Sequence, residues 1–462
     1  MTDFAAVDRA LEDRLESSLA ELSRLVAQPS VAAQNLGMEA CAEMVAAMLR
    51  ARGFTTEIMP AGGPPVVVAE RAGAGDGTLL IYNHYDVQPP EPLELWTSPP
   101  FQPTRRDGRL YGRGVSDDKG HITARLHAID ALLALDGELP CRVKFVIEGE
   151  EEISSVHLPE FVKRHAKRLA ADACLWEFGG VDHHDVPLQY AGLRGICYVE
   201  LSSETAKLDA HSGLGGSIFP NAAWRLTWAL ASLKGADERV RIPGFYDSVR
   251  PPTARDRELM AALPEVAGEY RSRYGLKRLL RGLDDGVELR IAEAFAPTCT
   301  ICGLTSGYQG PGSKTVMPAR ASAKVDFRLV PDQTPDRVVE QLRAHLDREG
   351  FDDVGVKLLG GEPPGRTDPD HPFIRLVAET AEPVYGTPMQ VVPMIGGSGP
   401  NHAFLHELKV PVATAGMGYP DARVHAPDEN IRIDLYLKHA KHVARLLAGF
   451  GSGARADSTG QP

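Results

Sequence analysis

The sequence predicts an α/β protein whose catalytic domain has a mixed, mostly parallel sheet flanked by helices. From residue 40 to about 190, short apolar strands alternate with helical stretches, which is typical of βαβ units. Four apolar strands each lead to a residue that can bind a divalent metal ion. They are TLLIYN before His84, RVKFVI before the acidic run 148–152, ACLW before Glu177, and VPVATAG, which leads through a turn to His425. Because ligands bind beyond the carboxyl ends of the strands in open α/β sheets, we expect an active site at this edge.

A second, inserted domain is predicted after about Leu193. ICYVELSSE and ASAKVDFRLVP alternate apolar and polar residues like strands with one exposed face. NAAWRLTWALASLKG and TPDRVVEQLRAHLDREG predict helices, in which we interpret Trp224 and Trp228 as core or interface residues. From about residue 372 the α/β pattern returns. We therefore predict an α+β two-layer sandwich inserted into the catalytic domain, with the catalytic domain at 1–192 and 366–450, the insert at 193–365 and a disordered tail at 451–462.

Composition and length restrict the class of protein. A chain of 462 residues needs at least two domains, and a net charge of −12 argues against nucleic acid and anionic membranes as partners. The first 31 residues predict one amphipathic helix ending near Pro29, with no signal-peptide pattern. Six irregularly spaced cysteines form no disulfide framework, and the pair Cys299 and Cys302 is interpreted as part of a strand. A reducing cytoplasm is the expected compartment.

His84 and Asp86 end the first of the four strands. Two residues apart in extended chain, they project to the same side. A carboxylate beside a metal-binding histidine commonly orients the ring through its other nitrogen. We therefore predict His84 as a ligand and Asp86 as its orienting partner; alternatively, the pair is an ordinary surface strand end.

The glycine-punctuated loop YGRGVSDDKG contains Asp117 and Asp118. Its glycines allow tight turns that place an aspartate deep in the crevice. A carboxylate offers one oxygen to each of two cations, so Asp117 is predicted to bridge them. The alternative is helix N-capping, because both aspartates precede the helical stretch HITARLHAI.

The run EGEEEISS places three consecutive glutamates after a buried strand. Enclosed and unpaired, they would be costly, whereas beside cations one can bind metal while its neighbour transfers a proton. The alternative is a solvated acidic loop.

Charge balance favours two metal ions. Carboxylates at Asp117, Glu152 and Glu177 with one bridging hydroxide carry −4, which matches two divalent cations. Two ions also explain two distant histidines, His84 and His425, one for each ion. Such ligands suit Zn²⁺, Mn²⁺ and Co²⁺; we expect two divalent ions per chain, with Zn²⁺ first and Mn²⁺ or Co²⁺ as alternatives.

The ordered motifs HYD, YGRGVSDDKG, EGEEEISS, AHSGLGG, GGSGP and VHAPDEN resemble the aminoacylase, carnosinase and glutamate carboxypeptidase family of dinuclear metallopeptidases. The resemblance implies the same roles for His84, Asp86 and Asp117. It also implies that Glu151 is the general base and Glu152 a ligand, with a one-residue slip to Glu150 as the alternative. Glu177 and His425 would complete the two coordination shells.

The resemblance also assigns roles to the inserted domain, as a lid and homodimerisation domain. His211 in DAHSGLGG would reach the partner subunit's active site and stabilise the oxyanion; taken alone, it is a loop or cap histidine. Arg328 in DFRLVPDQ would hold the substrate's carboxylate, or is an ordinary strand arginine. Gly397 and Ser398 would line the carboxylate end, or form a flexible turn.

Within the family, the carnosinase-like dipeptidase branch fits best. The observations are the DDKG variant, YAGLRGICYVEL and the long insert. We therefore expect a dipeptidase in which Glu151 activates a bridging water; the alternative is an N-acyl-amino-acid deacylase of aminoacylase or desuccinylase type. A catalytically silent binding relative is the alternative from another class.

Overall fold

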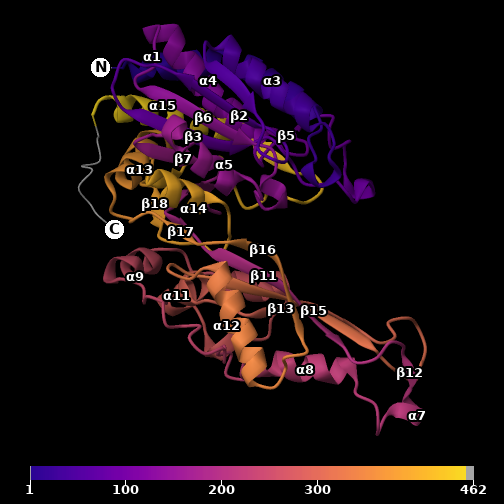
Figure 1. The fold of residues 1–462 in the computed structure, drawn as a ribbon. Helices are drawn as coiled ribbons and strands as arrows, with labels where there is room; N and C mark the ends of the chain where they lie inside the picture. The colour runs from indigo at the N-terminus through magenta and orange to yellow at the C-terminus, as the bar shows by residue number, and fades with distance from the viewer. Residues whose placement is uncertain (1, 454–462) are drawn as a thin grey trace. The chain divides into compact units, whose positions relative to one another are not determined.

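The computed structural model describes residues 2–453, which form two compact units (Figure 1). The first unit contains residues up to 191, 366–393 and those from 400 on; the second contains 192–365 and 394–399. The segment 394–399 is one that the sequence analysis places in the catalytic domain. Of the predicted disordered tail, Gly451 ends the last helix and residues 454–462 lie outside the described residues.

The first unit is built on a six-stranded sheet. The four strands that lead to predicted metal-binding residues are neighbours and run parallel, and only β2 runs in the direction opposite to the other five strands. The predicted fold class is confirmed. The order across the sheet is β1 (Thr55–Met59), β2 (Val66–Arg71), β6 (Arg142–Glu148), β3 (Thr78–His84), β7 (Ala173–Trp176) and β19 (Val412–Thr414).

Helices cover both faces of this sheet, so its strands are apolar on both sides. Leu79 and Ile81 belong to one core, and Leu80 and Tyr82 to the core on the opposite face. The first core is packed by α1 (Phe4–Asp13), α2 (Leu15–Ala27), α3 (Met38–Ala51), α4 (Lys119–Asp136), α13 (Pro372–Tyr385) and α15 (Ile433–Gly451). The second is packed by α5 (Leu158–Arg164) and α14 (Asn401–Ala403) (Figure 1), and by α6 (Ala166–Leu169).

The prediction of one N-terminal helix ending near Pro29 is wrong, because the segment forms two helices that break at Arg14. The two apolar faces pack differently. Leu11 of α1 joins the large core, whereas Leu22 of α2 joins a smaller one formed with the segment around Leu110.

Two small sheets complete the first unit. One contains β4 (Thr104–Arg106), β5 (Arg109–Tyr111) and β20 (Asn430–Arg432); the other contains β8 (Gly180–Val181), β9 (Pro187–Tyr190) and β18 (Gln390–Val392). The pairing of β20 with β5 is antiparallel. It brings the chain after His425 beside the chain before Asp117, although these residues are far apart in sequence.

The second unit is a two-layer α+β structure, as predicted. Its antiparallel sheet has the order β13 (Thr300–Ser306), β15 (Arg320–Leu329), β11 (Gly195–Glu204) and β16 (Gly355–Glu362). The helices α8 (Ala222–Leu233) and α12 (Pro335–Arg348) bury Leu226 and Leu342 against it. Shorter elements are β10 (Gly192–Leu193), β12 (Ala210–His211), α7 (Ser212–Gly215), α9 (Ala254–Ala261), α10 (Ala267–Tyr274), α11 (Val287–Phe295) and β14 (Val316–Met317), with β17 (Gly365–Arg366) at the sequence boundary.

Trp224 and Trp228 are not core residues. Their side chains stack on each other, with ring centroids 5.7 Å apart, and are 57% and 54% exposed. The core face of α8 is formed instead by residues such as Leu226 and Leu230. Of the two predicted roles for the tryptophans, burial in the core is wrong, and an interface remains a prediction.

The other composition-based predictions concern cysteines and membranes. All six cysteines are free, and Cys302 lies in β13, the predicted strand. Among the described residues, no helix is both long enough and apolar enough to cross a membrane.

Candidate active site

His84 is fixed at the end of β3 by Asp86. The ring is fully buried, and its Nδ1 atom lies 3.0 Å from the backbone oxygen of Asp86 and 3.3 Å from its carboxylate. The same carboxylate accepts hydrogen bonds from the backbone N–H groups of Glu151 and Glu152, at 3.2 and 3.0 Å. Asp86 therefore orients the His84 ring and the glutamate turn together, and leaves Nε2 of His84 directed into the cluster.

Asp117 lies between two histidines that come from opposite ends of the sequence. Its Oδ1 atom is 3.0 Å from Nε2 of His84, and its Oδ2 atom is 3.1 Å from Nε2 of His425. Each carboxylate oxygen thus faces a different imidazole. This arrangement suits a carboxylate that bridges two cations.

The remaining carboxylates divide between the two histidines. Oε2 of Glu177 lies 3.7 Å from His84, and Oε2 of Glu152 lies 3.1 Å from His425. Gln88 donates to Glu152 at 2.9 Å and so fixes that carboxylate. The structure brings together the five residues that the sequence predicts as metal ligands; their metal-binding roles remain predictions.

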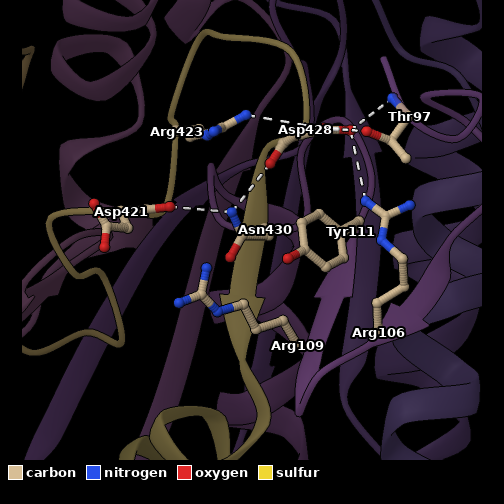
Figure 2. A pocket seen from close by; sticks show the side chains of 8 residues that line it. All are labelled: Thr97, Arg106, Arg109, Tyr111, Asp421, Arg423, Asp428 and Asn430. Atoms are coloured by element: carbon tan, nitrogen blue, oxygen red, sulfur yellow. Dashed lines mark hydrogen bonds and ion pairs between the residues drawn. The ribbon is translucent and has the colours of Figure 1, made fainter.

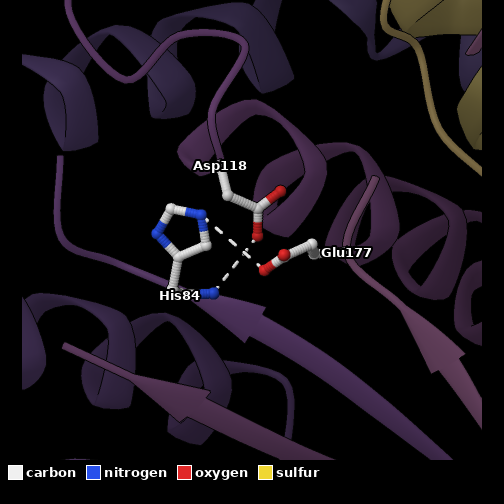
Figure 3. A group of neighbouring side chains, drawn as sticks. All are labelled: His84, Asp118 and Glu177. Carbon is white, nitrogen blue, oxygen red and sulfur yellow. Dashed lines mark hydrogen bonds and ion pairs between the residues drawn. The ribbon is translucent and has the colours of Figure 1, made fainter. Parts of the chain in front are cut away.

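Asp118 is closer to the cluster than the sequence analysis expects. With His84 and Glu177 it forms one of two groups whose possible ligand atoms lie within 4.8 Å of one another (Figure 3). Asp117, Glu152 and His425 form the other group. The Oδ2 atom of Asp118 already accepts from Asn83, at 2.5 Å, and from the His84 backbone, at 3.2 Å. The alternative prediction of side-chain N-capping does not hold for Asp118, which makes no capping hydrogen bond to α4.

The three glutamates of the acidic run point in different directions. The Glu150 carboxylate accepts a hydrogen bond from the ring of His157 at 2.9 Å, and is buried away from the two metal-binding groups. The Glu151 side chain interacts electrostatically with His84 and Asp117. Glu150 pairs with His157, and Glu152 pairs with His425. Of these three glutamates, Glu151 is the one that lies near the cluster and, among the described residues, has no histidine as a hydrogen-bond partner.

Several carboxyl groups and the two imidazole rings of His84 and His425 lie close together in the cluster, so each changes the pKa of its neighbours. Burial raises the pKa of Glu177 well above its usual range, and the neighbouring Glu151 adds to the shift. Burial opposes a low pKa at Asp117, but hydrogen bonds from His425 and His84 outweigh it and hold the pKa far below its usual range. Hydrogen bonds to Asp117 and Glu152 raise the pKa of His425 to about 10. Without a metal ion, protons on groups with a raised pKa, such as Glu177 and His425, offset the negative charge of the cluster.

The residues present fit two divalent cations. Each group combines one imidazole nitrogen with carboxylate oxygens, a donor set used by zinc, manganese and cobalt. Oε2 of Glu177 is buried without a hydrogen-bond partner, as expected for an oxygen that is free to bind metal. His425 remains about half exposed, so one side of the cluster is open to a substrate.

Arg125, which the sequence analysis did not single out, binds the carboxyl ends of the strands. Its buried guanidinium donates to the backbone oxygens of Tyr82, Trp176 and Ala415, at 2.9, 2.5 and 3.2 Å. These atoms end β3 and β7 and follow β19. One side chain from α4 therefore ties together three of the strand ends from which the cluster is assembled. A single arginine in an apolar helix is the only sequence signal for it.

The predicted substrate-binding residues lie in the second unit. Arg328 donates to the hydroxyl of Ser398 at 2.8 Å, and the Gly397 carbonyl accepts from the backbone of Arg194 at 2.9 Å. Burial and the nearby Arg328 lower the pKa of Arg194 to about 10, and Arg328 also forms an ion pair with Asp326 at 3.1 Å. His211 is exposed and accepts from the Gly213 backbone at 3.0 Å, as the N-cap of α7. Their roles remain predictions.

A family model described as peptidase family M20/M25/M40 matches residues 80–449. The chain belongs to this family. It is therefore a metallopeptidase, as the sequence predicts, and the resemblance stated from the motifs is confirmed.

Curated relatives carry dipeptidase names. The beta-Ala-His dipeptidase of Homo sapiens is 30% identical over 84% of this chain and 77% of its own length. The rat (Rattus norvegicus) enzyme of the same name is 32% identical over 65% of this chain and 62% of its own length. The Cys-Gly metallodipeptidase of Schizosaccharomyces pombe is 28% identical over 82% of this chain and 81% of its own length. The predicted likeness to the dipeptidase branch is confirmed.

Solved structures of the family match nearly the whole chain. An M20 family metallo-carboxypeptidase from Sulfolobus solfataricus has a TM-score of 0.90 and 37% identity, covering 94% of this chain and 99% of that one. Human carnosine dipeptidase 1 has a TM-score of 0.82 and 26% identity, covering 98% of this chain and 99% of that one. Their likeness supports the fold described above.

Proposed function

We propose that this chain is a metal-dependent dipeptidase that hydrolyses the amide bond of dipeptides or short peptides with a free carboxylate. The observation that carries the proposal is Asp117, whose two oxygens face His84 and His425 separately, at 3.0 and 3.1 Å. The dipeptidase names of the relatives support the substrate class.

In this proposal, His84 and Glu177 would hold one divalent ion, His425 and Glu152 would hold the other, and Asp117 would contribute to both. When bound, they would polarise the scissile carbonyl and lower the pKa of water. Zn²⁺ is our first choice, with Mn²⁺ or Co²⁺ as alternatives.

Glu151 is proposed as the general base. It takes a proton from the attacking water and returns it to the leaving amine. Its backbone N–H donates to Asp86 at 3.2 Å, and its side chain interacts electrostatically with His84 and Asp117, which supports this assignment. Glu150 is the weaker candidate because its carboxylate is already bound by His157.

The second unit would supply substrate contacts and the dimer interface. Arg328, with Ser398 and Gly397, would bind the substrate's carboxylate, and His211 of one protomer would stabilise the oxyanion in its partner's site. The exposed, stacked pair Trp224 and Trp228 supports a homodimer through this unit, because adjoining exposed apolar side chains are typical of protein–protein interaction sites. The six free cysteines support a reducing, cytoplasmic location.

The test is metal-dependent cleavage by protein stripped with chelator and reloaded with Zn²⁺, Mn²⁺ or Co²⁺. The panel contains mixed dipeptides, the same dipeptides with acylated N-termini, and acetyl- and succinyl-amino acids. The proposal requires release of amino acids from free dipeptides, restored only by metal. Cleavage of acyl-amino acids alone would replace the proposal with the deacylase alternative, and two bound ions without any cleavage would indicate a silent relative.

A carboxypeptidase is the second candidate. It is favoured by the structural likeness, at 37% identity, to the metallo-carboxypeptidase of Sulfolobus solfataricus. A carboxypeptidase releases the last residue of N-blocked dipeptides and of longer peptides, whereas a dipeptidase requires the free amino group. The N-acylated dipeptides in the panel therefore separate the two.

A further inference from the structure

Glu429 connects the two loops that carry Asp117 and His425. It is 1% exposed and accepts four hydrogen bonds from the loop before Asp117. Oε2 accepts from the Arg113 guanidinium at 2.8 Å and from the Gly114 backbone at 2.9 Å. Oε1 accepts from the backbone N–H groups of Ser116 and Asp117, at 2.9 and 3.0 Å. All four partners are donors, so the side chain acts as an acceptor-only carboxylate.

The backbone of Glu429 reinforces the same connection. Its carbonyl accepts from the Gly112 N–H at 3.0 Å, and the next residue, Asn430, pairs with Tyr111 in the small sheet. Glu429 follows His425 by four residues. One residue therefore fixes the backbone of the proposed bridging aspartate and the end of the loop that supplies the second histidine.

A polar cavity of about 450 Å³ borders the segment that carries His425. It is lined by Thr97, Arg106, Arg109, Tyr111, Asp421, Arg423, Asp428 and Asn430 (Figure 2). The loop is held on this side by polar contacts, including two from Thr97 to Asp428, at 2.9 and 2.7 Å. His425 and Asp428 both have positive φ angles, a conformation that non-glycine residues keep only when their surroundings enforce it.

We propose that Glu429 is a positioning residue that holds the Asp117 and His425 loops in the metal-binding arrangement before metal enters. This inference rests on the proposed two-metal site and extends it. It assigns to the glutamate of VHAPDEN a role that depends on its contacts with backbone N–H groups and not on contact with metal or substrate.

Hydrogen exchange tests the preformed loop in the wild-type chain. In chelator-stripped protein, the amides of residues 112–118 should exchange slowly, and adding Zn²⁺ should change their rates little. Exchange at the rate of an unstructured peptide until Zn²⁺ is added would overturn the proposal. This readout needs no variant and no activity, so it remains decisive even if the dipeptidase proposal fails.

Glu429→Gln tests the carboxylate itself. Glutamine keeps the size of the side chain but replaces one carboxylate oxygen with an NH₂ group. That group cannot accept the two hydrogen bonds that the oxygen accepted, so the loop loses two of its four contacts. We expect faster exchange of 112–118 and metal affinity weaker by ~10–100-fold, measured by competition with a chromophoric chelator. Asp428→Asn is the matched control, since Asp428 binds Thr97 and, within residues 2–453, forms no hydrogen bond or ion pair with the side chains of 112–118. Exchange of that segment should remain as in wild type.

If Glu429→Gln does not fold, Glu429→Asp replaces it. Its side chain is one methylene shorter and reaches only part of the donor set, so an intermediate loss of metal affinity is expected. Wild-type metal affinity in the folded variant, with only a lower melting temperature, would assign Glu429 a purely structural role and overturn the proposal.

Discussion

The carboxylate of Asp86 lies 3.3 Å from the Nδ1 atom of His84, on the side of the ring opposite the metal-binding cluster. Removing this charge should loosen both the ring and the turn at Glu151 and Glu152. We expect Asp86→Asn to weaken metal binding by ~10–100-fold, as measured by chelator competition. Asp172→Asn is the control, because Asp172 accepts from Thr78 at the opposite end of the same strand. Unchanged affinity in Asp86→Asn would show that Asp86 does not orient the ligand.

Glu151→Gln should abolish turnover while about two metal ions remain bound. The variant keeps the side-chain size but has no group that accepts a proton at neutral pH. Glu150→Gln is the paired variant; it removes the charge next to His157 and should retain most activity. Metal content by atomic emission and turnover of one dipeptide are measured for both. Loss of turnover in Glu150→Gln instead would move the base assignment by one residue.

Arg328→Met should affect only substrates with a free carboxylate. Loss of a charged hydrogen bond costs about 1.5–3 kcal/mol, so kcat/KM for a dipeptide should fall by ~10–100-fold. The C-terminal amide of the same dipeptide should be cleaved almost as before. Arg320→Met on the same strand, where Arg320 pairs with Glu204, should change neither. An equal fall for acid and amide would exclude carboxylate recognition by Arg328.

The fold and the cluster were predictable where apolar strands end directly in polar residues. His84 and Glu177 follow buried runs of neighbouring parallel strands, so sequence order alone indicated a common edge. Arg125 and Glu429 were missed, and Asp118 was considered only as a helix cap, because their importance depends on groups in distant segments. Arg125, for example, donates to carbonyls around residues 82, 176 and 415, and no local pattern encodes such contacts.

Changing Trp224 or Trp228 to Glu should produce monomers. A charge buried in an apolar interface is costly, and both side chains are more than half exposed in a single chain. Light scattering should give a mass near the 50.0 kDa of one chain for each variant and twice that for wild type. Val156→Glu, at an exposed apolar position in the first unit, should remain dimeric. A wild-type chain that is itself monomeric would contradict the proposed interface.

Two predictions about helices were wrong, namely the single N-terminal helix and the burial of Trp224 and Trp228 in the core, and both have the same cause. Leu11 and Leu22 follow one helical period along the N-terminal segment, but they pack into different cores. The tryptophans of α8 share helical spacing with buried leucines, yet they lie on the opposite face. Periodicity predicts that a face is apolar and does not specify which core, or which partner, covers it.

His442 should make the free energy of unfolding depend on pH in the acidic range. It is fully buried, its Nε2 lies 2.9 Å from the Val377 carbonyl, and burial lowers the pKa of His442 to about 4. The unfolded chain takes up the proton near pH 6.5 and the folded chain only near pH 4, so stability is complete above about pH 6.5 and falls as the pH drops towards 4.

His442→Gln tests this dependence because glutamine can donate the same hydrogen bond but does not titrate. The advantage of wild type over the variant should shrink by roughly 1–3 kcal/mol between pH 7.5 and pH 5, and should stay constant between pH 7.5 and pH 9. Chemical denaturation with chelator present, to keep metal out of the comparison, measures both. A difference that is independent of pH would show that His442 is not buried as the neutral form.

The pairing of β19 with β7 has a consequence for how the polypeptide is made. About 240 residues separate the ends of these strands, and the ribosome needs roughly 10–50 s to synthesise them. During that interval the growing chain already contains His84, Asp117 and Glu177, while the edge of β7 has no strand beside it and His425 does not yet exist. The nascent protein therefore passes through a stage in which one half of its metal-binding cluster is complete and its sheet has an open edge, which is the point at which aggregation and premature metal capture must be prevented.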